Sequence, residues 1–325
     1  MKKFTFAPLA LFVTVCALTH LCEAAQMALK LEGDPESYFA APDHQSLVAD
    51  LGSAFTVEAW VNPAVNTTDG SIPNEYMILN KEDSYEISVR NEDPSTEGTF
   101  QVAVKPLDGA WEWRDSTETV PVNKWTHVAA TWDGLVIRTF VSGKFLMAFD
   151  KPGVDGGTGV LNVLGADGTA ATLKVGRRVR GDAVRHSIYT GLIDEIRISK
   201  VIRYTEAGFA LPKSAFTPDA DTVALYHFDE AIGSVVKDAS SFGNHGTLIK
   251  NAVLVPANTP ITSTPPAGEP TISATRKVDG VSIMFTGTLE SANDIKGPWT
   301  AVQGAVSPLS VKTDQSKLFY RSRSQ

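Results

Sequence analysis

The chain has 325 residues, of which 43% are hydrophobic and 20% are charged, and this is enough for one large globular domain and a smaller one. Its formal net charge is −8 at pH 7. That acidic balance argues against nucleic acid or an anionic membrane surface as a partner. It is compatible with divalent cations and with neutral or cationic glycans.

The first 24 residues have the features of a secretory signal peptide. Two lysines precede a largely apolar run (Phe4–Leu21), and the small residues Ala24 and Ala25 follow it. The run is short and contains polar residues and a proline, so a membrane-spanning helix is not expected. No later segment is apolar enough to span a bilayer. We therefore expect a secreted, periplasmic or cell-envelope protein, whose oligomeric state the sequence leaves open.

Both cysteines, Cys16 and Cys22, lie within this leader. A lipoprotein anchor at one of them is the alternative to a plain signal peptide, although Val15 and Leu21, which precede them, are bulkier than the small residue usual there. Without the leader the chain has no cysteine. Its stability must then come from core burial and any bound metal, since disulfides are impossible.

Short segments of β-like pattern follow one another from Leu29 onward, separated by turns rich in Gly, Pro, Asn and Asp, with no long helical period. About a dozen such strands predict an all-β protein, built as a two-sheet antiparallel sandwich. The expected strands include residues 28–31, 38–40, 55–61, 76–80, 85–89, 100–104, 126–132, 136–141, 173–175 and 191–199.

A change of composition marks the end of this sandwich. Residues 256–270 contain five prolines and several Thr and Ser residues, which predicts an exposed linker. The sandwich is thus expected to occupy residues 27–255, with 20 basic and 31 acidic residues and a net charge of −11. A small β module is expected over residues 271–325, with seven basic and four acidic residues and a net charge of +3.

One strand, Gly191–Ser199, contains an unexpected carboxylate. Strict alternation places Asp194 on the same side as Leu192, Ile196 and Ile198. A buried carboxylate costs several kcal/mol unless it is paired or binds a metal, so Asp194 requires a partner.

This strand and three earlier segments (Phe55–Trp60, Trp125–Gly134 and Val141–Lys144) together resemble the laminin-G-like, concanavalin A-like jellyroll family. The resemblance runs from about residue 28 to about residue 255 and implies a two-sheet antiparallel jellyroll. The family includes lectins, adhesins and glycosidases, so the resemblance leaves the ligand open. The last residues resemble a small module that is often appended to exported proteins of planctomycete and verrucomicrobial bacteria.

The resemblance also implies a structural calcium ion at Asp194, with Glu32 and the carbonyl of Gly33 as the other ligands. Carboxylate and carbonyl oxygens are the ligands that Ca²⁺ requires. The alternative is that Asp194 is hydrogen-bonded to backbone amides, or paired with Arg197 or another cation.

Trp111 and Trp113 form a candidate ligand-binding pair. Alternation along a strand places them on one side, with Glu112 and Arg114 opposite. Two coplanar indoles on a sheet face offer a large apolar contact area with polar edges, which suits sugar rings. The alternative is that both indoles pack in the core or under the loop of residues 93–99.

The sequence argues against an enzyme. Glucanases of this fold carry a Glu-x-Asp-x-Glu strand or a bulged variant of it, and the nearest run here, Glu82–Glu86, has the wrong register. A Gly-x-Ser-x-Gly motif and a nucleophilic cysteine are also absent. We expect a secreted, non-catalytic protein that binds a carbohydrate or an extracellular protein. A structural component of the cell envelope or matrix is the alternative, and a divergent glycoside hydrolase is a weaker one.

The leader can be tested directly. Amino-terminal sequencing of the exported protein should begin near Ala25 or Gln26, because signal peptidase cleaves after small residues. A mature chain that retains Lys2 and Lys3 would contradict this expectation.

Overall fold

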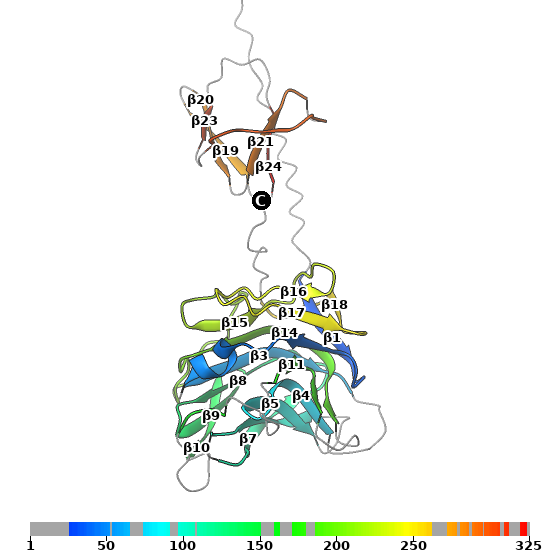
Figure 1. The fold of residues 1–325 in the computed structure, drawn as a ribbon, viewed down its shortest axis with the longest axis vertical. Helices are drawn as coiled ribbons and strands as arrows, with labels where there is room; N and C mark the ends of the chain where they lie inside the picture. The colour runs from blue at the N-terminus through cyan, green and yellow to red at the C-terminus, as the bar shows by residue number, and fades with distance from the viewer. Residues whose placement is uncertain are drawn as a thin grey trace, which may run out of the picture. The chain divides into compact units, whose positions relative to one another are not determined.

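The computed structural model describes residues 26–323 apart from 53, 66–73, 92–96, 108, 151–158, 163–170, 180–185, 262–271, 278–279, 286–287, 295, 306–308 and 312–318. The predicted signal peptide lies outside the described residues. The chain divides into two compact units, with the division between residues 264 and 265 (Figure 1), and each unit is described by itself. In the described part of the chain, no helix is long and apolar enough to cross a membrane.

The larger unit consists of two antiparallel sheets packed face to face. Sheet A contains, in spatial order, β10 (Lys144–Asp150), β9 (Val136–Val141), β8 (Thr126–Trp132), β3 (Phe55–Pro63), β14 (Thr190–Ser199), β1 (Met27–Glu32) and β18 (Val253–Pro256), and β15 (Thr222–Tyr226) also pairs with β14. Sheet B contains β16 (Val235–Val236), β17 (Gly246–Ile249), β2 (Tyr38–Ala41), β11 (Leu173–Val175), β4 (Asn74–Lys81), β5 (Tyr85–Asn91), β6 (Glu97–Val104) and β7 (Glu112–Pro121). This architecture confirms the predicted all-β jellyroll sandwich.

Shorter elements connect these strands. Two 3₁₀ turns, η1 (Gln45–Leu47) and η2 (Ala49–Leu51), follow β2, and the hairpin formed by β12 (Arg177–Val179) and β13 (His186–Ile188) follows β11. Gly176 lies between β11 and β12 with φ +86°, and a Cβ atom there would lie 2.1 Å from a methyl carbon of Leu31. The chain can therefore turn out of sheet B at this position only with glycine.

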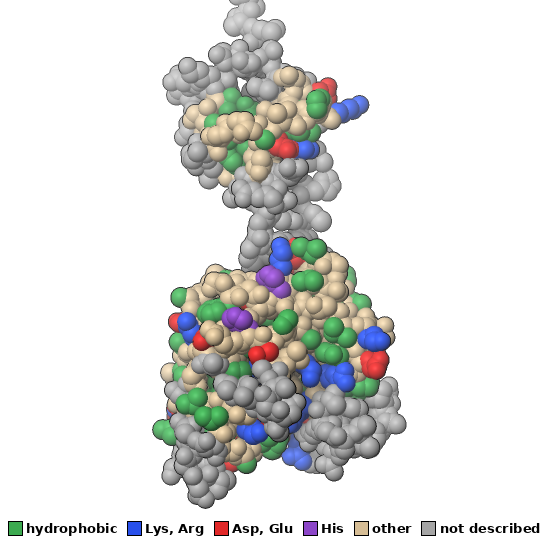
Figure 2. All heavy atoms as spheres, viewed as in Figure 1, with side chains coloured by type: hydrophobic (Ala, Val, Ile, Leu, Met, Phe, Trp, Pro, Cys, Tyr) green, Lys and Arg blue, Asp and Glu red, His purple; other side chains and the backbone are tan. Residues whose placement is uncertain are grey.

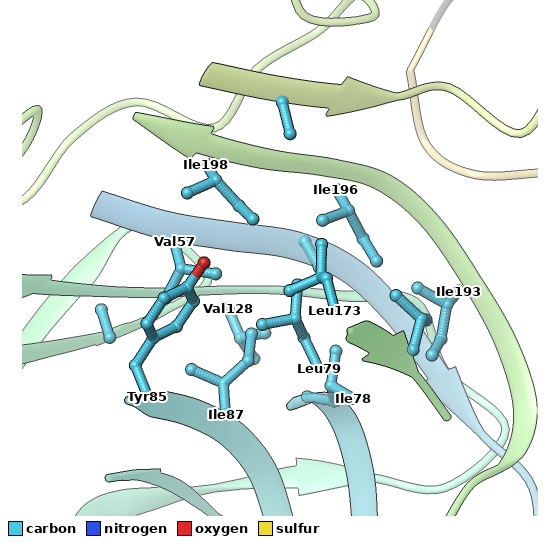
Figure 3. Close-up of a cluster of buried hydrophobic side chains, with 14 of the residues drawn as sticks. Val57, Ile78, Leu79, Tyr85, Ile87, Val128, Leu173, Ile193, Ile196 and Ile198 are labelled. Atoms are coloured by element: carbon cyan, nitrogen blue, oxygen red, sulfur yellow. The ribbon is translucent and has the colours of Figure 1, made fainter. Parts of the chain in front are cut away.

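The hydrophobic core lies between the two sheets. Side chains alternate along each strand, so every second residue points inward. Figure 3 shows Val57 and Val128 of sheet A facing Tyr85 and Ile87 of sheet B, and all four are at most 1% exposed. Burying a large apolar side chain contributes about 1.5–3 kcal/mol, which makes this interface the main source of stability.

The last strands of the larger unit lie beside its first strands. β18 pairs with β1, and β17 pairs with β2. The unit extends beyond residue 255, because the backbone N–H of Ala257 donates to the carbonyl of Gln26 (2.8 Å) and Thr259 is 3% exposed. The first residues of the predicted linker thus pack on the sandwich.

Two three-stranded antiparallel sheets make up the smaller unit. One contains β19 (Ile272–Lys277), β20 (Gly280–Phe285) and β23 (Leu309–Val311), and the other contains β22 (Thr300–Ala301), β21 (Thr288–Ala292) and β24 (Phe319–Arg323). Arg321 pairs with Glu290 (2.7 Å) and lies 4.5 Å from the ring centroid of Trp299.

On the larger unit, charged side chains of both signs are scattered among uncharged ones over the face seen in Figure 2.

The predicted alternation in β14 is wrong at its centre. Glu195 has φ +50°, in the left-handed region, and the pairing of β14 with β3 shifts register between Asp194 and Arg197. A β-bulge of this kind inserts one extra residue and changes which side chains face inward. Ile193 therefore joins Ile196 in the core, and Asp194 lies on the outer side of sheet A.

Asp194 is 1% exposed and hydrogen-bonded, as the alternative interpretation proposed. Its Oδ1 accepts from the backbone N–H of Glu195 (2.8 Å) and its Oδ2 accepts from Oγ1 of Thr259 (2.6 Å). Burial raises the pKa of Asp194 well above its usual range, and the nearby carboxylates of Glu195 and Asp229 add to the increase.

Substitution of Asp194 by Asn should therefore stabilise the protein at neutral pH. A carboxyl whose pKa is raised on folding stabilises the fold below its unfolded pKa of about 4, and this contribution is lost as the pH rises. The oxygen of Asn can accept from the N–H of Glu195, its amide nitrogen can donate to Oγ1 of Thr259, and it cannot ionise. In urea unfolding from pH 4 to pH 8, we expect Asp194→Asn to gain stability relative to wild type as the pH rises, with each kcal/mol raising the melting temperature by about 2–4 °C.

Asp219→Asn is the matched control with the opposite sign. The guanidinium of Arg203 holds the pKa of Asp219 below its usual range, so this variant should lose stability above pH 4. An Asp194→Asn variant that is less stable than wild type at every pH would contradict the account of Asp194.

Candidate functional site: the outer face of sheet B

A buried polar network occupies the outer side of sheet A. Glu58 is fully buried, and its carboxylate accepts from Nε of Arg197 (2.8 Å) and from the hydroxyl of Tyr204 (2.6 Å), with Nε2 of His127 at 3.2 Å. Burial opposes ionisation of Glu58, but His127, Arg197 and Tyr204 outweigh it and lower the pKa of the carboxyl.

The segment that follows β14 covers this network. The rings of Tyr204 and Phe209 stack with centroids 3.6 Å apart, and the ring centroid of Phe209 lies 5.4 Å from that of His127. The ring of Phe216 lies 4.0 Å from the guanidinium carbon of Arg197. These aromatic side chains close over the centre of sheet A, whereas the outer face of sheet B carries an exposed indole, that of Trp113.

The strand pattern determines which side chains reach that face. Tyr85, Ile87 and Val89 of β5 point into the core, so Glu86 between them points outward. Glu86 pairs with Ala103 of β6, which pairs with Trp113 of β7. Because paired residues lie on the same face of a sheet, Glu86 and Trp113 lie on the outer face, two strands apart.

Arg178 of the β12–β13 hairpin contacts side chains on this outer face. Its Nε and Nη2 donate to the two carboxylate oxygens of Glu82 (2.9 Å each), and its Nη1 donates to Oε1 of Glu86 (3.0 Å). The side chain amide of Asn80 donates to Oε2 of Glu86 (3.0 Å). Arg178 is only 5% exposed, so the hairpin is held to the sheet by a buried ionic cluster.

Glu86 holds Trp113 as well. Its Oε1 also accepts from the indole Nε1–H of Trp113 (2.8 Å). Burial raises the pKa of Glu86 to about 7, although the guanidinium of Arg178 acts in the opposite direction, and the carboxylate of Glu75 adds to the increase. With both oxygens engaged and 1% exposure, Glu86 fixes its neighbours in place.

Trp111 and Trp113 lie together, as the sequence predicted, but their arrangement differs. The two indoles stack, with centroids 5.4 Å apart and planes 27° apart, where a side-by-side coplanar pair was expected. The guanidinium carbon of Arg178 lies 4.9 Å from the ring centroid of Trp111 and 5.7 Å from that of Trp113. Trp113 is 36% exposed and Trp111 is half-buried, so the stack, called the tryptophan stack below, reaches the surface.

Polar side chains lie next to the tryptophan stack. Gln101 donates from its amide to Oδ1 of Asp115 (2.7 Å), and Asp115 forms a long ion pair with Arg90 (3.5 Å). The side chains of Asp115 and Arg90 are 44% and 46% exposed. An exposed aromatic surface with hydrogen-bonding groups at its edge can bind a ring that has one apolar face and polar substituents.

The predicted calcium ligands are not brought together. Glu32 pairs with Thr190, at the start of β14, and forms an exposed ion pair with Lys30 (2.7 Å); the N–H of Gly33 donates to the carbonyl of Tyr189. Asp194 lies four residues further along β14, which is about 13 Å. Calcium–oxygen distances are about 2.3–2.6 Å, so Glu32, Gly33 and Asp194 do not form one ligand set in this structure. Among the residues that the structure describes, no group of three or more His, Cys, Asp or Glu residues could hold a metal ion.

Sequence reasoning missed Arg178, the residue that organises the site. Its contacts with Glu82 and Glu86 span more than ninety positions and depend on how the hairpin folds over sheet B. The available signal was the pair Arg177–Arg178 directly after Gly176, because two adjacent arginines beside a turn point to opposite faces of a strand.

Comparisons with solved structures agree with this fold. A putative carbohydrate binding protein from Bacteroides ovatus is similar over 73% of this chain and 61% of its own length, with 18% identity and a TM-score of 0.52, so the chain spans less than two thirds of that protein. A heptameric SAP-like pentraxin from Limulus polyphemus is similar over 57% of this chain and 80% of its own, with 11% identity and a TM-score of 0.39. The CBM40 of Ruminococcus gnavus IT-sialidase, bound to α2,3 sialyllactose, is similar over 55% and 92%, with 12% identity and a TM-score of 0.40.

At these identities the likeness concerns the fold alone. A search of curated protein sequences gives no significant match. A laminin-G-type family model, described as the concanavalin A-like lectin/glucanases superfamily, matches residues 32–206, which is more than half of the chain. The chain therefore belongs to the concanavalin A-like lectin/glucanases superfamily.

Proposed function

We propose that this chain is an exported, non-catalytic glycan-binding protein whose ligand packs on the tryptophan stack. The observation that carries the proposal is the stack itself: two indoles in contact, one of them 36% exposed, fixed by a buried Glu86 and Arg178. Sugar rings present an apolar face of C–H groups and an edge of hydroxyls, and indoles with polar neighbours match both.

The fixed geometry favours binding energetically. Association has to overcome the loss of side-chain freedom at the interface, at about 0.5–1.5 kcal/mol for each immobilised side chain. Trp113 is already held by its hydrogen bond to Glu86, and both indoles contact Arg178. A ligand therefore meets a preorganised surface. That one structurally similar protein is named as a putative carbohydrate binding protein is consistent with this role.

The hydrogen bonds that engage Glu82 and Glu86 favour a binding role over glycoside hydrolysis. A general acid or base must come within about 3 Å of the proton that it transfers. Glu86 is 1% exposed and accepts from Trp113, Arg178 and Asn80, and both oxygens of Glu82 accept from Arg178. These contacts support a role for Glu82 and Glu86 in positioning the proposed binding surface.

Removing the exposed indole should weaken binding. A glycan array with the mature protein identifies a ligand, and isothermal titration then compares wild type with Trp113→Ala. We expect the dissociation constant to rise at least about tenfold, equivalent to about 1.4 kcal/mol, because the contact area is lost. Leu135→Ala is the matched control, since Leu135 is 64% exposed in the β8–β9 turn and its loss should leave the affinity unchanged.

Glycan affinity that survives Trp113→Ala unchanged would place the ligand elsewhere on the molecule. Binding that depends equally on Leu135 would mean that the ligand adheres to exposed apolar side chains without specificity.

Glu86→Gln separates the binding role from hydrolysis. Gln keeps an oxygen for the indole of Trp113 but loses the charge that pairs with Arg178, so we expect weaker glycan binding and a lower melting temperature, while Glu82 still pairs with Arg178. Wild type should release no reducing sugar from β-glucans. Glu36→Gln removes an exposed carboxylate and serves as the control. Sugar release by wild type that Glu86→Gln abolishes would instead identify Glu86 as a catalytic residue.

A further inference from the structure

Two cations lie next to each other on the outer face of sheet B, beside the ionic cluster of Arg178. Lys174 is the middle residue of β11, and its neighbours Leu173 and Val175 point into the core, so Lys174 points outward. Arg177 begins β12, and its guanidinium carbon lies 4.8 Å from the ring centroid of Tyr38 in the adjacent strand β2. We call Lys174 and Arg177 the basic pair.

The basic pair lacks a counterion within the described part of the chain. No carboxylate there lies within ion-pair distance of either cation, and Nε of Arg177 is buried without a hydrogen-bond partner. The carboxylate of Glu82 acts on Lys174 by raising its pKa, but both oxygens of Glu82 accept hydrogen bonds from Arg178. An unpaired buried guanidinium nitrogen is costly, and most such groups in proteins have an acceptor.

The two cations also repel each other. Burial lowers the pKa of Lys174, and the positive charge of Arg177 lowers it further. Arg178 is paired with Glu82 and Glu86, and the charge of Glu75 also acts on it, whereas Lys174 and Arg177 have no ion pair within the described part of the chain. These two cations without an ion pair contrast with residues 27–255 as a whole, which carry a net charge of −11.

From this arrangement we infer that the basic pair binds an oxyanionic substituent, a sulfate or a carboxylate, carried by a glycan. This inference rests on the proposed function and names the ligand class for the same face: an acidic polysaccharide. The planar guanidinium of Arg177 can donate two parallel hydrogen bonds to two oxygens of such a group. Lys174 supplies a second positive charge, and Tyr38 supports Arg177 from below.

The overall acidity of the protein makes the inference specific. A protein with a large net negative charge repels polyanions at long range, so binding of an acidic glycan requires a local positive site. The basic pair is such a site: Lys174 lies in β11 before the turn at Gly176, and Arg177 begins β12 directly after it. Lys174 and Trp113 lie in one row across the sheet, four strand spacings or about 19 Å apart, so different sugar residues of one extended polysaccharide would contact the tryptophan stack and the basic pair.

The test compares matched neutral and acidic polysaccharides: dextran with dextran sulfate, and galactan with polygalacturonate. The variants are Lys174→Gln/Arg177→Gln and a control of equal charge change, Lys144→Gln/Lys250→Gln, whose side chains are 67% and 63% exposed. We expect wild type and the control to bind an acidic member at least tenfold more tightly than its neutral partner. The double variant at the basic pair should lose that preference and keep its affinity for the neutral member. The dextran pair tests recognition of sulfate, and the galactan pair tests recognition of carboxylate.

Equal affinity of wild type for neutral and acidic members would overturn the inference, and so would an acidic preference that the double variant retains. Trp113→Ala separates these results from the proposed function, because it should weaken binding of both members alike. Arg177→Lys tests the site even if the double variant folds poorly. It keeps the charge but removes the forked donor, so its preference for the acidic polysaccharide should be smaller than that of wild type and should not be lost completely.

Inorganic sulfate tests the basic pair without any glycan. Sodium sulfate and sodium chloride at equal ionic strength are compared by thermal unfolding, since an ion that binds only the folded state raises its melting temperature. The additional increase in sulfate should be larger for wild type and the control than for the double variant. Equal increases in all three proteins would overturn the anion site, whereas a positive result with no glycan binding would support the site and contradict the proposed function.

Discussion

The ion pairs of Arg178 with Glu82 and Glu86 hold the candidate site together. Breaking a buried ion pair by removing one partner leaves an uncompensated charge and costs about 3–5 kcal/mol, so each of these groups requires the others. Arg178 is 5% exposed and Glu86 is 1% exposed. Through them the β12–β13 hairpin is fixed to sheet B, and through Glu86 and the guanidinium the two indoles acquire a defined orientation.

Each outer face of the sandwich carries a buried polar cluster, and the two clusters are covered in different ways. On sheet A the polar network around Glu58 lies beneath Tyr204, Phe209 and Phe216, which serves stability. On sheet B an equally polar cluster lies beneath a short hairpin, and Trp113 remains exposed beside it. Both clusters contain a buried glutamate and an arginine. Among the described aromatic side chains of the two clusters, Trp113 is exposed while Tyr204 and Phe209 are half-buried, which is why we propose ligand binding on sheet B.

The sequence was sufficient for the sandwich because alternating strands and turn residues act locally, and for the same reason it placed Trp111 and Trp113 together, although not as a stack. It was insufficient where the answer depends on backbone conformation or on distant contacts. The positive φ of Glu195 reverses the side on which Asp194 lies, and a glutamate at this position does not predict a positive φ. The register of β1 against β14 separates Glu32 from Asp194. Arg178 meets its partners only after the hairpin has folded over sheet B.

The most direct test of the central claim is the response of the indole N–H signals in a nitrogen-15 NMR titration with the glycan that the array identifies. The signals of Trp111 and Trp113 should shift, because their rings would contact the ligand and the Nε1–H of Trp113 is held by Glu86. Those of Trp60 and Trp132, which are 3% and 0% exposed, should stay in place as internal references. A saturable titration in which Trp111 and Trp113 do not move would show that the glycan binds away from the tryptophan stack.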